Sequence, residues 1–221
     1  MTTPDAILHT VSLQTQLFGR IAFGAGAAGL LLLVSLHFAK PDLAPSWHMV
    51  SEYAIGPHGW LMTACFAMLA LSCLSLLIAL VPLTTSLLGW FGLAFLLLTA
   101  CAYGLAAIFP TDPITVGPDQ ASAAARLHAL AFAIGVPGFI LASQLISFAL
   151  LGNPLWDPVR FAAFAFAHLN WIGLGLMVAI IAIMLPKTGG FGPEVLIGWP
   201  NRLMFATYFG WLVTSAWPLV R

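Results

Sequence analysis

Six long apolar stretches, almost free of charged residues, constrain the fold of this chain more than any other feature of its sequence. A membrane-spanning helix needs about 20 mostly apolar residues at a rise of ~1.5 Å per residue. Proline or glycine stands near the ends of each stretch, and these residues end helices because they remove a backbone donor or permit a left-handed turn. The expected spans cover approximately residues 20–38, 59–81, 86–109, 124–151, 158–185 and 200–218. The sequence therefore predicts an all-α integral membrane bundle of six transmembrane helices.

Composition places the chain in the same class and excludes others. Of the 221 residues, 61% are apolar and 6% are charged, whereas soluble proteins carry roughly 25% charged residues. The formal net charge is zero, which argues against nucleic acid as a partner because phosphate binding requires a surplus of Lys and Arg. Cys65, Cys73 and Cys101 lie within apolar stretches and lack CxxC spacing, so we interpret them as small buried hydrophobic residues.

The chain divides into an N-terminal segment, residues 1–19, and a single six-helix transmembrane domain, residues 20–221. The N-terminal segment carries Asp5 and no basic residue, so it lacks the positively charged region of a signal peptide. Its residues 7–18 alternate apolar and polar side chains at roughly helical spacing. We expect this segment to lie along the membrane interface or to be frayed.

Ionisable residues concentrate in the three loops that lie on one side of the expected bundle. With six spans, successive loops fall alternately on two faces, and the first, third and fifth loops cover residues 39–58, 110–123 and 186–199. On or beside these odd-numbered loops lie Asp42, His48, Glu52, His58, Asp112, Asp119, Arg126, His128, Glu194 and Arg202. Lys and Arg divide four to three between the faces, so the positive-inside rule does not orient the chain. Any chemistry is expected at the odd-loop face.

The first odd loop contains the densest group of polar residues. Pro45 and the Gly56-Pro57 pair bracket a segment in which His48 and Glu52 stand four residues apart, on one side of a helix. We expect a short interfacial helix here, with His58 in the first turn of the next span. The alternative interpretation of His48 and Glu52 is a solvated pair without a function.

Further polar residues stand at the starts of later spans. Prolines on both sides of Thr111-Asp112 fix the direction of the carboxylate, which alternatively caps the loop. Arg126 and His128 enter the fourth span, and His128 is expected to point inward or to bond a neighbouring helix. Arg202 stands in the first turn of the sixth span, where a cation opposes the helix dipole. We therefore expect Arg202 to pair with a carboxylate, either Glu52 or Asp112.

Two cofactor hypotheses follow from the histidines. Glu52, His58, Asp112 and His128 supply two carboxylates and two imidazoles, enough for a zinc-like divalent metal with an open position for water, although no HExxH motif is present. Haem is not expected, because His168 lies near the bilayer centre whereas the other candidate axial ligands, His37 and His128, lie near the odd-loop face. His168 and Asn170 are alternatively polar contacts between helices.

The motifs in the odd loops resemble those of the DUF998 family of bacterial and archaeal six-span membrane proteins. The resemblance is carried by SEYAIGPHGW at residues 51–60, FPTDP at residues 109–113, His128, and Asn201-Arg202. The layout more distantly resembles six-span proteins of the damage-regulated autophagy modulator type. These resemblances imply the fold, a prokaryotic cell (inner) membrane with the odd loops outside, and membrane- or lipid-linked roles. They imply no reaction.

Three functions remain open, and whether the chain is an enzyme is undecided. The first is a membrane protein whose polar loop face binds a lipid headgroup or a partner protein, with Arg126 and Arg202 on phosphate and the arginines held by Glu52 and Asp112. The alternative is a metal-dependent intramembrane hydrolase acting on lipid. The third is a small-solute transporter with His168 and Asn170 along its path.

Overall fold

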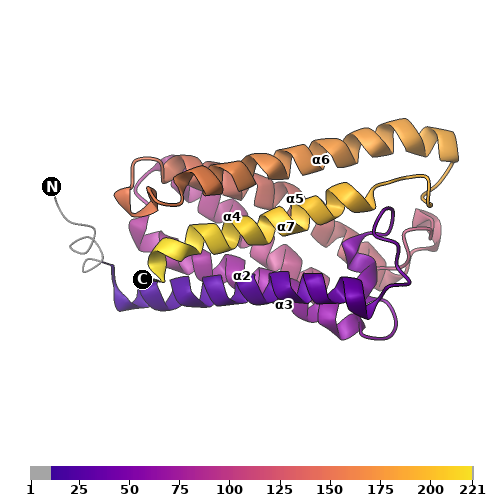
Figure 1. The fold of residues 1–221 in the computed structure, drawn as a ribbon, viewed down its shortest axis with the longest axis horizontal. Helices are drawn as coiled ribbons and strands as arrows, with labels where there is room; N and C mark the ends of the chain where they lie inside the picture. Colours follow the sequence, from indigo (N-terminus) through magenta and orange to yellow (C-terminus); the bar gives the residue numbers. More distant parts are fainter. Residues whose placement is uncertain (1–10, 221) are drawn as a thin grey trace.

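The computed structural model describes residues 11–220, and within them the chain forms the predicted all-α bundle of six long helices. These helices run along one common long axis (Figure 1). They are α2 (Leu13–Ala39), α3 (Gly59–Leu80), α4 (Leu87–Ile108), α5 (Ala123–Ala149), α6 (Arg160–Thr188) and α7 (Gly198–Ala216). Short 3-10 turns connect or extend them: η1 (Val50–Ala54), η2 (Val81–Leu83), η3 (Pro118–Gln120), η4 (Pro154–Trp156) and η5 (Trp217–Leu219).

The protein is an integral membrane protein, because five of these helices, α2 to α6, are long and apolar enough to cross a bilayer. The sixth, α7, is a helix of 19 residues that carries Asn201 and Arg202 near its start, and these residues lower its mean hydropathy. In Figure 1, α7 lies between α6 and α2. Most of its side chains are buried by the other helices, so α7 is an interior element of the bundle.

Side-chain caps explain where several helices begin. Ser12 accepts a hydrogen bond from the amide of Thr15 at 3.1 Å and thereby starts α2 at Leu13, earlier than the predicted residue 20. Ser86 and Ser122 cap α4 and α5 in the same way. Residues 13–19, expected in an interfacial or frayed segment, therefore continue the first helix. The part of that prediction concerning residues 1–10 lies outside the described residues.

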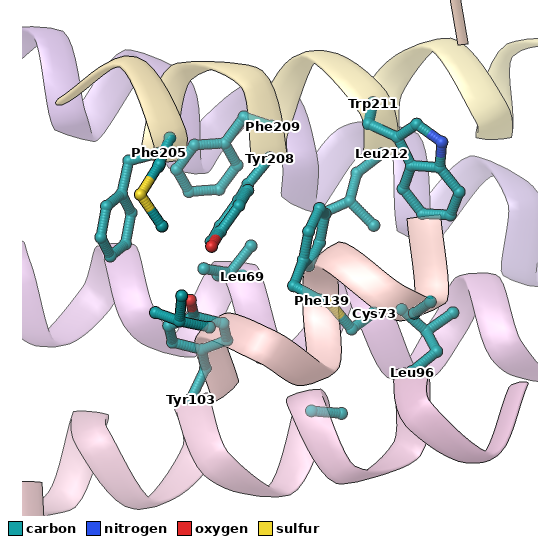
Figure 2. Packing of buried hydrophobic residues seen from close by; sticks show 14 of the residues in the cluster. Leu69, Cys73, Leu96, Tyr103, Phe139, Phe205, Tyr208, Phe209, Trp211 and Leu212 are labelled. Atoms are coloured by element: carbon teal, nitrogen blue, oxygen red, sulfur yellow. The ribbon is translucent and has the colours of Figure 1, made fainter. Parts of the chain in front are cut away.

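The core between α4, α5 and α7 is built from large aromatic side chains (Figure 2). The rings of Phe139 and Tyr208 stack at a centroid distance of 4.1 Å, and Trp211 meets Phe139 edge to face. The Trp211 indole N–H donates to the Ser147 hydroxyl at 3.0 Å, so this ring is satisfied inside the bundle. Such close, directional packing is what joins helices that are apolar on every side.

A buried polar contact links α5, α6 and α7, as predicted for Asn170. Its amide donates to the Ser143 hydroxyl at 3.3 Å, and its carbonyl oxygen accepts from the Thr207 hydroxyl. The prediction is wrong for His168, which is exposed and donates from Nδ1 to the Phe164 carbonyl of its own helix. Of the cysteines, Cys65 and Cys73 are buried as predicted, but Cys101 is exposed on α4.

The three odd-numbered loops gather at one end of the bundle, on the right in Figure 1, and the C-terminus lies at the other end. The loop joining α2 to α3 contains η1, which is the short helical element predicted for this loop. Val50, Glu52 and Tyr53 of η1 are buried, so this turn packs into the end of the bundle. This end carries the candidate site.

Candidate functional site

A pocket of about 270 Å³, which we call the loop-end pocket, opens at the odd-loop end. Its apolar lining comprises Met49 and Ile114 from the loops, Ala129 and Phe132 of α5, Met177 and Ile181 of α6, and Phe191 and Ile197 before α7. Its polar lining comprises Ser51, Glu52, Thr111, Asp112 and His128. Three predicted site residues, Glu52, Asp112 and His128, thus share one cavity although they come from three separate parts of the sequence.

Glu52 joins the first and second odd loops from within the protein. Its carboxylate accepts hydrogen bonds from the amide of Met49 at 2.7 Å, from the amide of Ile114 at 3.0 Å and from His48 Nδ1 at 3.1 Å. Only 2% of the residue is exposed. His48 and Glu52 contact each other, as their four-residue spacing allows, but Glu52 is buried whereas His48 is only half-buried. The carboxylate satisfies backbone donors that the loops would otherwise leave unpaired.

Asp112, near the start of the second odd loop, binds Ser122 at the end of that loop, just before α5. One carboxylate oxygen accepts from the amide of Ser122 at 2.7 Å and the other from the Ser122 hydroxyl at 3.1 Å. Ser122 in turn caps α5 through the amide of Ala125. The interpretation of Asp112 as a loop cap is therefore confirmed, and the same residue lines the loop-end pocket.

His128 is buried on α5 and points inward, as predicted. Its Nδ1 lies 2.8 Å from the carbonyl oxygen of Phe109, which ends α4, and a carbonyl can only accept, so Nδ1 carries the proton. The edge of the ring packs on Phe66 of α3 at a centroid distance of 5.6 Å. A backbone contact and an aromatic contact together hold the orientation of this imidazole at the pocket.

Arg202 does not pair with a carboxylate, so the predicted partnership with Glu52 or Asp112 is wrong. Its guanidinium donates to the carbonyl oxygens of His48 at 2.6 Å and Gly198 at 3.2 Å. It also donates to His37 Nε2 at 2.9 Å and to the Tyr53 hydroxyl at 2.9 Å, and it stacks over the Tyr53 ring. Neutral acceptors surround the cation, and 9% of the residue is exposed. Arg202 fastens the first odd loop to α7 and does not line the pocket.

Two further residues, to which the sequence alone assigned no role at the site, hold the same loop. Lys40, at the end of α2 and 5% exposed, donates from Nζ to the carbonyl oxygens of Tyr53 and Ile55. The Asn201 side chain accepts from the amide of Val50 at 2.8 Å. The only sequence signal for Lys40 is its position directly after the first apolar stretch. At this loop, buried cations are bonded to carbonyl oxygens rather than paired with carboxylates, as charge alone would predict.

Gly198 allows the first odd loop to approach α7 closely. Its amide donates to the Ser46 carbonyl at 2.9 Å. A Cβ atom on Gly198 would lie 2.3 Å from the Pro45 carbonyl oxygen and 2.8 Å from the His48 carbonyl oxygen. No other residue type fits here without displacing the backbone, and the position of His48 and Glu52 depends on it.

The remaining predicted site residues lie outside the loop-end pocket. His58 is exposed, with a left-handed backbone (φ 61°) just before α3. Arg126 is exposed on α5 and donates to the carbonyl oxygen of Ala121 at 2.7 Å. Across residues 11–220, no three His, Cys, Asp or Glu side chains come close enough to hold a metal ion. The predicted zinc-like set of Glu52, His58, Asp112 and His128 is therefore not assembled: His58 stands apart, and the other three do not converge closely enough to share an ion.

The comparisons with known proteins identify a family but no individual relative or solved structure. Neither the curated proteins nor the solved structures contain a match to this sequence. The more distant resemblance to damage-regulated autophagy modulators is not shown by these comparisons and stays a prediction. The family model described as "Protein of unknown function (DUF998)" matches residues 17–218, from the first turns of α2 into η5, just after α7, and the chain therefore belongs to the DUF998 family.

Proposed function

We propose that this DUF998 protein binds a membrane amphiphile in the loop-end pocket, with the polar head against Glu52, Asp112 and His128. The observation that carries the proposal is the mixed lining of the pocket. Loop residues and His128 supply the polar groups, while the membrane-spanning helices α5 and α6 supply Phe132, Met177 and Ile181. A cavity whose helix side is apolar apart from His128, and whose loop side carries the other polar groups beside apolar residues, can accept the chain and the head of a lipid.

The size of the pocket favours one acyl chain with its head. At about 270 Å³ the cavity is just below the roughly 300–1,000 Å³ of typical small-molecule sites. A ligand that enters from the bilayer can leave part of its acyl chain outside the pocket, against the lipid-facing surfaces of the helices. The pocket therefore needs to enclose only the head and the first part of the chain. We favour lipid over a protein partner because the polar groups lie inside a cavity rather than on a flat surface.

The other two hypotheses gain no specific support. A metal-dependent hydrolase requires ligands in one place, and three such side chains do not converge among residues 11–220. A transport path along His168 and Asn170 requires both to face one channel, yet His168 is exposed and Asn170 is buried against Ser143. The prokaryotic inner membrane and an extracytoplasmic odd-loop end belong to the proposal as well, and they rest on the family resemblance.

Ala129→Trp is the variant that tests the proposal. Ala129 lines the pocket on α5, and an indole at this position would fill the space meant for the ligand. We expect native mass spectrometry of protein extracted in mild detergent to detect a lipid-sized adduct on the wild type and to find it lost from Ala129→Trp.

Leu130→Trp provides the matched control, because Leu130 is the next residue on α5, is 50% exposed and does not line the pocket. This variant should keep the adduct. An adduct retained equally by Ala129→Trp and Leu130→Trp, or absent from the wild type, would contradict binding at this pocket.

A further inference from the structure

We infer that the amphiphile carries a protonated amine in its head, an inference that rests on the proposed function and identifies the ligand class. The ionisable side chains that line the loop-end pocket are Glu52, Asp112 and His128. No Lys or Arg lines it. Two carboxylates in the lining of a cavity that contains no Lys or Arg make the site complementary to positive charge. The predicted phosphate contact through Arg126 and Arg202 does not apply to this pocket.

The positions of the nearby cations exclude them as internal partners of these carboxylates. Arg202 and Lys40 are committed to carbonyl oxygens of the first odd loop. Arg126 is exposed and bonded to the Ala121 carbonyl. His48 is the one basic side chain that contacts either acid within residues 11–220, and it contacts only Glu52. The charge of Asp112 therefore remains available to a ligand.

The hydrogen bonds of the two acids leave acceptor capacity on the oxygens. Each Asp112 oxygen accepts one bond, both from Ser122, and each carboxylate oxygen can accept two. Glu52 Oε1 already accepts two bonds, while Oε2 accepts one from Met49. Up to three acceptor positions are thus open, and an ammonium group has three N–H donors. Neither acid has a donor to offer a phosphate, which would instead face like charge.

Three amphiphiles with the same twelve-carbon chain separate charge from hydrophobicity: dodecylamine, 1-dodecanoylglycerol and dodecyl phosphate. Their affinities for the full-length protein in maltoside detergent at pH 7 are measured by native mass spectrometry. An alkylamine is protonated at this pH, since a lysine side chain has a pKa near 10.4. We expect dodecylamine to bind about tenfold more tightly than the glyceride, the factor supplied by roughly one charge-assisted hydrogen bond, and dodecyl phosphate to bind most weakly.

Asp112→Asn tests the source of the preference, since it keeps the shape and the contact with Ser122 but removes the charge. This variant should lose most of the amine preference and keep its affinity for the glyceride. Glu194→Gln is the control, because Glu194 is an exposed acid before α7 that does not line the pocket, and it should leave all three affinities unchanged.

The outcomes distinguish this inference from the proposed function. If the glyceride binds in a manner that Ala129→Trp abolishes, but the amine gains nothing or the phosphate binds best, the amine inference is overturned while the proposed function stands. If no probe binds in a manner sensitive to Ala129→Trp, the proposed function fails. If Asp112→Asn does not fold, the ranking of the three probes on the wild type still decides the inference.

Discussion

Arg202→Met is expected to lower the free energy of unfolding by about 3 kcal/mol, because it leaves several buried acceptors without a donor. The His48 carbonyl, the Tyr53 hydroxyl and His37 Nε2 all depend on this guanidinium. Methionine preserves most of the volume, so the change reports the lost hydrogen bonds rather than a cavity. Unfolding in a series of SDS concentrations, followed by circular dichroism, measures the difference.

Arg202→Lys should recover part of the loss, since a single ammonium keeps the charge but cannot form the planar fork to several acceptors. Arg126→Met is the matched control at the same end of the bundle, where the arginine is exposed and bonded only to a nearby carbonyl. That variant should change stability by less than about 0.5 kcal/mol. Equal effects of Arg126→Met and Arg202→Met would show that the contacts of Arg202 do not hold the loop.

Glu52→Ala is expected to cost a similar amount, about 3 kcal/mol, because two half-buried amides and His48 lose the buried carboxylate that accepts from them. The amides of Met49 and Ile114 belong to two different loops, and the Glu52 carboxylate bonds both. We expect the variant to loosen the second odd loop in particular. Hydrogen exchange at Ile114, compared with the wild type, measures that local effect alongside the loss of global stability.

Glu52→Gln should fall between the wild type and Glu52→Ala, since its amide keeps one acceptor oxygen but places a donor against an N–H group. Glu194→Ala removes an exposed carboxylate beside the same loops and should be nearly neutral. Ile114 exchange that stays as slow in Glu52→Ala as in the wild type would contradict the role of Glu52 as the bridge between the loops.

The sequence predicted the helices well because length and apolarity are the physical conditions for a span. Pro110, for example, ends the third apolar stretch, and α4 ends at Ile108. The start of α2 was missed because residues 13–19 contain Gln14, Thr15 and Gln16, which made the segment look interfacial. In the structure the Ser12 cap and the buried position of Thr15 carry the helix through this polar turn.

The site was predicted in part, and the errors have a common physical origin. The distribution of charged residues along the sequence predicted that Glu52, Asp112 and His128 lie at one end of the bundle. In the structure they line one pocket. The same distribution paired Arg202 with an acid, because carbonyl oxygens are invisible in a sequence until the path of the chain is known. The path here depends on Gly198, whose missing side chain lets the first odd loop reach Arg202.

His58 shows that residues close in sequence need not be close in space. It lies six residues after Glu52, yet η1 and the left-handed turn at Gly56 and His58 separate them. Glu52 is buried and His58 is exposed. A metal site that includes both residues would require the loop to continue in one direction from Glu52 to His58. The positive φ angles at Gly56 and His58 turn the chain away instead.

The most direct test of the central claim is a cryo-electron microscopy map of the protein in nanodiscs made from its native lipids, with an antibody fragment bound at the end opposite the odd loops. The proposed function requires continuous non-protein density between α5 and α6 that contacts Phe132 and ends beside Asp112. The same density should be missing from the map of Ala129→Trp. A well-resolved wild-type pocket that contains only water, or is closed by its own side chains, would contradict the claim.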